Sequence, residues 1–122
     1  MAAVRPSSYA YLRTGQGWSG QELAQARHEL IVYAHREGFT VAELFVERPG
    51  LRHGSALGAL VESIESTGVR DVVAPSLTHF GPAGRDRRAI ERQLGARLWV
   101  IRQPPETTRA AGLAVDGSAT VA

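Results

Sequence analysis

The segment YAYLRTGQGWSG, from Tyr9 to Gly20, combines the patterns of a strand, a glycine-rich turn and the start of a helix. Ser19 followed by Glu22 forms a capping box, in which each side chain satisfies a free backbone N–H of the first helical turn. A strand that runs through glycines into a helix is a common anion-binding position, because unpaired N–H groups and the positive end of the helix dipole meet there. This turn is therefore the predicted functional surface of the chain.

Strand and helix patterns alternate along the sequence after this turn. The first strand is predicted at residues 8–13 and the first helix at residues 19–37, with Gly38 as its stop. The later predicted elements are a strand at 40–47, a helix that Ser55 caps and Gly68 ends, a strand at 70–74, a helix at 85–94 and a strand at 96–102. Between them, residues 48–54 and 75–84 form two loops rich in glycine and proline.

This alternation predicts right-handed crossovers and a parallel sheet. We therefore predict a three-layer α/β domain at residues 8–102, with a mainly parallel four-stranded sheet, helices on both faces and room for a short fifth strand at one edge. A polar lead at residues 1–7 precedes it, and a flexible tail at residues 103–122 follows it.

The composition narrows the classes of function. All 14 basic residues are arginine and stand against 12 acids, and this net charge of +2 is too small to predict nucleic-acid binding by itself. The absence of cysteine excludes disulfides, a thiolate nucleophile and cysteine-based metal sites. No stretch has the pattern of a signal peptide or a membrane span, so we expect a cytoplasmic protein without a membrane partner.

Four short patterns follow one another along the chain. They are Tyr11-Leu12-Arg13, Leu30-x-x-Tyr33-Ala34 before Gly38, Ala56-Leu57 with Leu60-Val61, and Asp71-Val72-Val73 leading to Leu77-Thr78-His79-Phe80-Gly81-Pro82. In this order they resemble the N-terminal catalytic domain of serine recombinases, the resolvase/invertase family. The resemblance covers about residues 9–102 and implies a resolvase-like catalytic core that acts on DNA.

The resemblance also implies where the family's chemistry should lie. Members of the family attack a DNA phosphodiester with a serine two residues after the first-strand arginine. Here Arg13 matches that arginine, but Gly15 stands at the serine position. Thr14 lies one residue away and is expected to point to the opposite side of the strand.

The family's other phosphate-binding positions are also changed. The arginine expected before the second helix falls on Gly54, with Arg52 nearby, and the aspartate and two arginines after the third strand fall on Thr78, His79 and Pro82. These departures predict a pseudo-recombinase rather than an enzyme. Its predicted role is a non-catalytic interaction or regulatory module, associated with DNA or with a DNA-bound protein partner, and a homodimer is the candidate assembly.

The predicted anion site consists of Arg13, Gly15, Gln16, Gly17 and His79. Neither a metal nor a cofactor is predicted, because the histidines lack the spacing of a ligand pair.

A basic patch is predicted on the third helix from Arg85, Arg88 and Arg92. It suits phosphate contacts. A solvated helix face partly paired with Asp86 and Glu91 is the favoured interpretation, because charge runs usually serve only to solvate a helix.

The glycine turn supports a second hypothesis. Gly15-x-Gly17-x-x-Gly20 has the G-x-G-x-x-G spacing of a dinucleotide-binding turn, and Glu47 ends the next strand. Arg13 stands where such folds prefer a small apolar residue. The alternative function is thus a small-molecule or nucleotide-binding protein, in which Trp18 either packs on the domain or waits for a partner.

Overall fold

The computed structural model describes residues 5–49, 54–81 and 86–102. Four parallel strands form one sheet in the order β2-β1-β3-β4. The strands are β1 (Ser7–Arg13), β2 (Thr40–Glu47), β3 (Asp71–Ala74) and β4 (Arg97–Val100); the helices are α1 (Gly20–Arg36), α2 (Ser55–Thr67), α3 (Arg87–Leu94) and the short 3₁₀ helix η1 (Leu77–Phe80). The predicted three-layer α/β architecture is confirmed, and the described residues contain no fifth strand.

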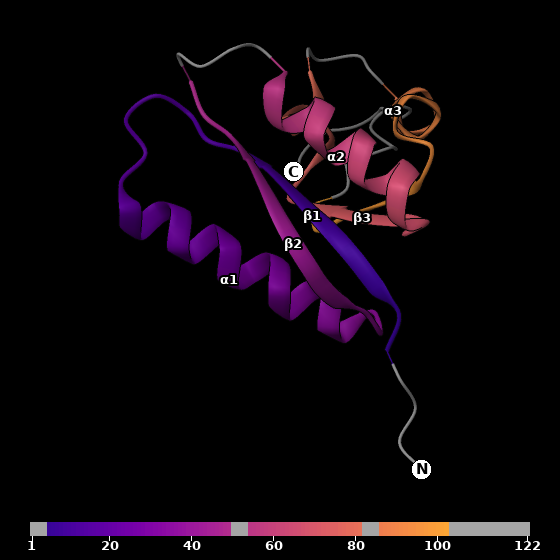
Figure 1. Cartoon of the computed structure of the whole chain (residues 1–122). Helices are drawn as coiled ribbons and strands as arrows, with labels where there is room; N and C mark the ends of the chain where they lie inside the picture. The colour runs from indigo at the N-terminus through magenta and orange to yellow at the C-terminus, as the bar shows by residue number, and fades with distance from the viewer. Residues whose placement is uncertain (1–4, 50–53, 82–85, 103–122) are drawn as a thin grey trace, which may run out of the picture.

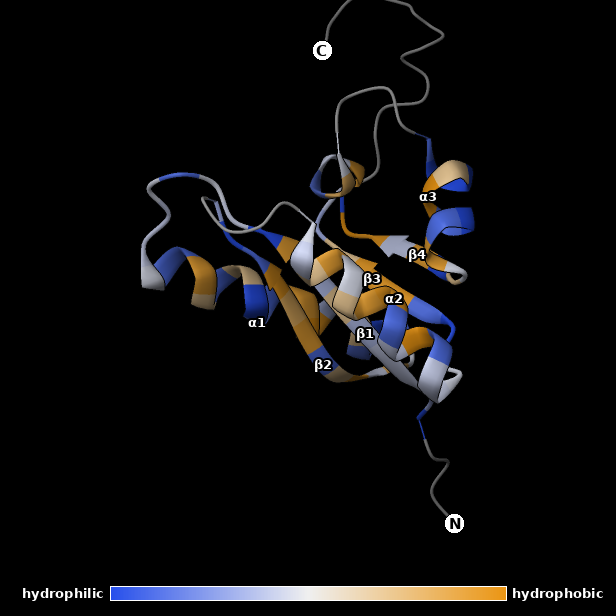
Figure 2. Ribbon diagram, turned by 45° about the horizontal axis from the view of Figure 1, so that its top comes forward, coloured by the Kyte–Doolittle hydropathy of each residue, from blue (hydrophilic) through white to orange (hydrophobic). Residues whose placement is uncertain are grey.

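Helices lie on both faces of the sheet (Figure 1), and a hydrophobic core fills the space on each face. On one face, Leu30 and Ala34 of α1 pack against Ala10 and Leu12 of β1. On the other face, α2, α3 and η1 cover the alternate strand residues, including Tyr11. Figure 2 shows that the strands carry much of the hydrophobic colour, as expected for a sheet covered on both faces.

The chain connections place a topological switch point at the carboxyl edge of the sheet. The α1 connection runs from β1 to β2 on one face, and the α2 connection leads from β2 back past β1 to β3 on the other. The strand order therefore reverses between β1 and β3, and open α/β sheets bind ligands outside the carboxyl ends of the strands at such a point. Arg13 ends β1 there, opposite Glu47 at the end of β2.

The helix starts confirm one predicted cap and correct another. Ser19 and Glu22 form the predicted capping box, with N–H···O distances of 3.1 Å to Ser19 Oγ and 2.8 Å to Glu22 Oε1. The prediction that Ser55 caps α2 is wrong: the cap position is Gly54, which has a φ of 79° and no side chain to offer. The third helix begins at Arg87, two residues later than predicted, because Asp86 caps it by accepting from Ala89 N–H at 2.7 Å.

Candidate functional site

The backbone N–H of Arg13 donates to His79 Nδ1 at 2.9 Å, which joins the end of β1 to η1. This bond leaves the imidazole proton on Nε2. Burial, the positive charge of Arg102 and that of Arg13 lower the pKa of His79 from 6.5 to about 4. At neutral pH His79 is therefore an uncharged ring whose Nε2–H remains a donor.

One N–H donor of the Arg13 guanidinium has no acceptor within the described residues. This donor is Nε, which is buried. On the neighbouring inward position, burial and the Glu47 charge raise the pKa of Tyr11, while its hydrogen bond to Arg13 opposes that rise. A buried donor without a partner costs free energy, so an acceptor from outside the chain would stabilise this arrangement.

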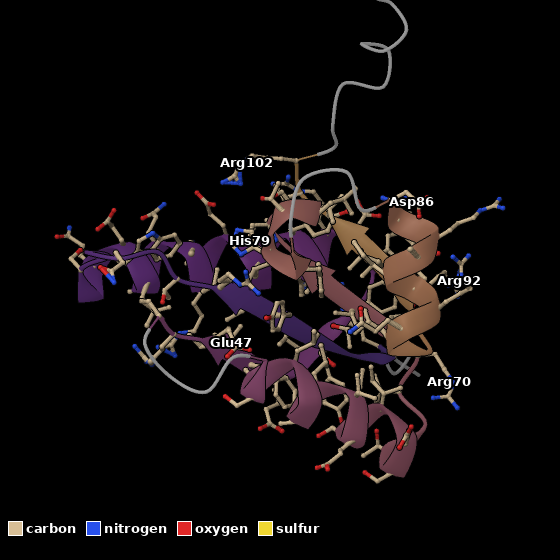
Figure 3. The ribbon with its side chains drawn as sticks, turned by 90° about the horizontal axis from the view of Figure 1, so that it is seen from above. Glu47, Arg70, His79, Asp86, Arg92 and Arg102 are labelled. Atoms are coloured by element: carbon tan, nitrogen blue, oxygen red, sulfur yellow. The ribbon has the colours of Figure 1, made fainter. Side chains whose placement is uncertain are left out.

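A second guanidinium lies near His79 at the same edge. Arg102 follows β4, where its backbone N–H donates to Pro75 O at 2.9 Å. Its side chain is exposed, 3.8 Å from the exposed carboxylate of Glu29. Figure 3 shows His79 near the middle of the view with Arg102 above it, and the charge of Arg102 is the second cause of the lowered His79 pKa. Arg13 and Arg102 thus concentrate positive charge around a neutral histidine.

Glu47 is a buried carboxylate that closes the start of α2. Its Oε1 accepts from Ala56 N–H at 3.1 Å and from Leu57 N–H at 3.3 Å, and the Tyr11 hydroxyl donates to the same oxygen at 3.4 Å. The amino end of this helix is therefore already occupied by an acid from β2. The sequence interpretation missed this role. The available signal was an acid at the end of a strand, followed by a helix whose cap position, Gly54, has no side chain.

The structure divides the predicted anion site. Gly15 and Gly17 line a pocket of about 290 Å³ beside the start of α1, together with Trp18 and Arg48. Arg13 instead contacts His79 on the η1 side of β1. Gln16 is exposed.

One further position near the family's nucleophile can be placed. Thr14 is buried, and its hydroxyl donates to the Glu47 carbonyl at 3.4 Å. Arg52 and Pro82 lie outside the described residues, as do residues 103–122, which were predicted as a tail.

Gly15 is covered by the Trp18 side chain. A Cβ added at Gly15 would lie 3.0 Å from Trp18 Nε1 and 3.2 Å from its Cδ1. We predict that Gly15→Ala lowers the free energy of unfolding by about 1 kcal/mol, as mild overpacking does. Urea unfolding of Gly15→Ala, Trp18→Ala and the double variant should show that the cost of Gly15→Ala vanishes once the indole is removed. An equal cost in both backgrounds would contradict this contact.

The predicted basic patch is separate from Arg13 and His79. Arg88 and Arg92 are exposed on α3, whereas Arg85 lies outside the described residues. Figure 3 shows Arg92 on the outer side of α3, away from His79. These arginines can act only as an additional contact, not as part of the cluster at the carboxyl edge.

The described part of the chain contains no group of three or more histidine, aspartate or glutamate residues placed to hold a metal ion. None of its helices is both long and apolar enough to cross a membrane.

Comparison with known proteins identifies the fold. No family model and no curated protein sequence matches the chain significantly. Among solved structures, it is similar to the C-terminal catalytic domain of ISC1926 TnpA, an IS607-like serine recombinase, with a TM-score of 0.62 and 19% sequence identity. The similarity covers 84% of this chain and 73% of that one.

This comparison contradicts the prediction of a non-catalytic pseudo-recombinase. The similar structure is a catalytic domain, which points toward an enzyme. The prediction relied on Gly15 at the nucleophile position and on the changed phosphate-binding positions before the second helix and after the third strand. The structure nevertheless brings Arg13 and His79 together at the carboxyl edge. The assignment of Gly15 to the nucleophile position itself stays a prediction. The chain is a recombinase-like α/β domain with the fold of a serine recombinase catalytic domain.

Proposed function

We propose that this domain binds DNA through its phosphodiester backbone, with one phosphate held by Arg13 and His79 at the carboxyl edge between β1 and β3. The observation that carries the proposal is the buried Arg13 Nε, which has no hydrogen-bond partner within the described residues. The His79 imidazole adds an uncharged donor beside it. The proposal gives a concrete form to the DNA association predicted from the sequence: the group that the domain binds is a backbone phosphate.

The chemistry of the cluster favours a phosphate over a neutral ligand. A guanidinium presents its donors in a planar fork that matches two oxygens of a phosphate. Arg13 and Arg102 both act on His79 electrostatically, so an anion placed between them would relieve repulsion as well as accept hydrogen bonds. Because Glu47 already fills the start of α2, an external anion at this edge must use other donors, such as those of Arg13.

The position of the site suits a long ligand that passes over the edge of the sheet. Arg48 follows β2, Arg13 ends β1 and Arg102 follows β4, so all three lie at the carboxyl edge. The exposed Arg88 and Arg92 on α3 offer an additional phosphate contact. The small net charge of +2 is compatible with DNA binding when the arginines are concentrated in this way.

The test is titration of the full chain with a fluorescently labelled duplex at several salt concentrations, followed by anisotropy. Log affinity should fall linearly with log salt, with a slope near −0.9 per neutralised phosphate. We predict that Arg13→Ala weakens binding of all duplex sequences alike and reduces the slope by about one unit. Arg36→Ala is the matched control, because it removes an exposed arginine from the last turn of α1 instead of from the carboxyl edge of the sheet.

Each alternative result points elsewhere. Absence of binding at low salt would overturn the proposal. A slope that Arg13→Ala leaves unchanged, but that falls when Arg88 and Arg92 are replaced, would move the phosphate contact to α3. In that case the cluster around His79 would have no role in DNA binding.

A further inference from the structure

Trp18 is the large aromatic residue at the surface of the glycine turn. Its side chain is 37% exposed, although its pyrrole edge lies against Gly15. It lines two pockets, the one of about 290 Å³ described above and one of about 450 Å³ toward the middle of α1. An exposed indole between two hollows offers a surface on which a planar group can stack.

The two pockets differ in charge. The larger one is lined by Glu22 and Glu29 as well as Arg102. In the smaller one, Arg48 is the only charged group among the described lining residues; the others are Thr14, Gly15, Gly17, Trp18, Ser19, Gly20, Leu23 and Pro49. Arg48 is exposed, and no ion pair is recorded for it within the described chain. The smaller pocket therefore combines an aromatic surface with an unbalanced positive charge.

The size and backbone of the smaller pocket also limit its ligand. About 290 Å³ lies at the lower end of the range for small-molecule sites, which start near 300 Å³. Gly17 adopts a φ of +81°, which a residue with a Cβ rarely reaches, so the chain keeps this wall free of side chains. An anionic group and a planar ring of modest size fit these constraints together.

We propose that this pocket holds one unpaired nucleotide unit, with its base stacked on Trp18 and its phosphate paired with Arg48. Stacking on an aromatic side chain is tolerant of sequence because every base has a π face. Arginine pairs with the phosphate through charge-assisted hydrogen bonds. The unit is either a free mononucleotide or an unpaired nucleotide within a DNA strand. This site goes beyond the proposed function, because neither Arg13 nor His79 lines it.

Tryptophan fluorescence of the full chain tests the proposal, because Trp18 and Trp99 are its two tryptophans. The chain is titrated with deoxyadenosine monophosphate, with single-stranded oligothymidine and with deoxyribose 5-phosphate. We predict saturable quenching by at least one of the two ligands that carry a base and none by the sugar phosphate. Quenching should disappear in Trp18→Phe, since Trp99 lies elsewhere, bonded through Nε1 to Asp71 at 3.0 Å.

The variants separate the two contacts. Arg48→Ala should raise the Kd about tenfold, and Arg36→Ala should leave it within about twofold. Trp18→Ala should raise the Kd roughly tenfold or more, as expected for one lost base stack. Binding to this variant is measured by calorimetry, because the reporting tryptophan is gone. If Trp18→Ala does not fold, Arg48→Ala still tests the site.

The outcomes also identify the source of the nucleotide. If the mononucleotide binds as tightly as the strand does, per nucleotide of the strand, the natural occupant is a free nucleotide. If only the strand quenches the fluorescence, the occupant is an unpaired nucleotide of DNA. Absence of saturable quenching by both, or quenching that Arg48→Ala leaves intact, overturns the proposal. Arg13→Ala should leave quenching by the mononucleotide unchanged, so this test and the duplex titration can fail independently.

Discussion

Replacing Glu47 with alanine is expected to lower the free energy of unfolding by about 3 kcal/mol, because the change removes the acceptor that closes α2. Two backbone N–H groups, those of Ala56 and Leu57, would lose their partner in a half-buried position. The Tyr11 hydroxyl, which is buried in the core, would lose the same partner. Gly54 cannot compensate, since it has no side chain that could cap the helix.

Urea unfolding followed by circular dichroism measures this loss. Glu47→Gln is the informative companion, because its amide oxygen can still accept from Ala56 and Leu57, and it should cost less than the alanine variant. Glu43→Ala is the matched control, since it removes an exposed glutamate from the same strand. A loss of stability in Glu47→Ala no greater than that in Glu43→Ala would mean that the carboxylate does not support α2.

The position of Glu47 also explains why an anion site is expected beside Arg13. The amino end of a helix attracts anions, and in α2 that place is taken by a carboxylate of the chain itself. The Glu47 carboxylate occupies the N–H groups at the amino end of α2, so a phosphate cannot bind there, and the same contacts hold β2 and α2 together. Among the described residues, the buried side-chain donor without a partner is Arg13 Nε, on the neighbouring strand.

The fold could be predicted from the sequence because its signals are local. Ser19 and Glu22 specify the start of α1 within a few residues, and the apolar run around Leu98 predicts a strand covered on both faces. Element boundaries differ by only a few residues from those in the structure, for example at Arg87 in α3. Local pattern and tertiary packing agree along most of the chain, which is why the prediction of a parallel sheet succeeded.

The site could be predicted only in part, because its contacts join distant segments. The bond from Arg13 to His79 spans β1 and η1, and the candidate pair was proposed from the resemblance rather than from spacing. The cap that Glu47 provides depends on the register of β2 against β1 and on the path of the following loop. Arg102 was missed because its approach to His79 follows from the strand order, which single-residue patterns do not encode.

The enzyme prediction was wrong for a related reason. It treated the residue at position 15 and the changed phosphate-binding positions as decisive, and it gave less weight to the architecture that surrounds them. The structure shows that Trp18 fills the space beside Gly15, so a small residue there also serves packing.

Acid is expected to destabilise this domain through His79. Its pKa is about 4 in the folded chain and near 6.5 when unfolded, so the unfolded state binds the proton first as the pH falls. The stability that depends on a neutral His79 is fully present above about pH 6.5, decreases between pH 6.5 and pH 4, and is lost below pH 4. The change in the His79 pKa from 6.5 to about 4 sets an upper bound of roughly 3 kcal/mol on this loss, and the partial exposure of the ring makes the loss smaller.

The measurement is urea unfolding at pH 7 and at pH 4.5, for the wild type and for His79→Gln. The glutamine side chain can accept from Arg13 N–H but cannot bind a proton, so the wild type should lose more stability than the variant between the two pH values. His35→Gln, which removes an exposed imidazole from α1, should retain the pH dependence of the wild type. Equal losses in the wild type and His79→Gln would show that His79 does not govern the acid response.

The same experiment links the histidine to the proposed phosphate. Repulsion by Arg102 and Arg13 contributes to the low pKa, so an anion bound between these arginines should raise the pKa of His79 toward its ordinary value. A short duplex at saturating concentration should then reduce the stability lost between pH 7 and pH 4.5 in the wild type. The duplex should have no such effect on the pH dependence of Arg13→Ala. A duplex that binds without changing the acid response of the wild type would place the phosphate away from His79.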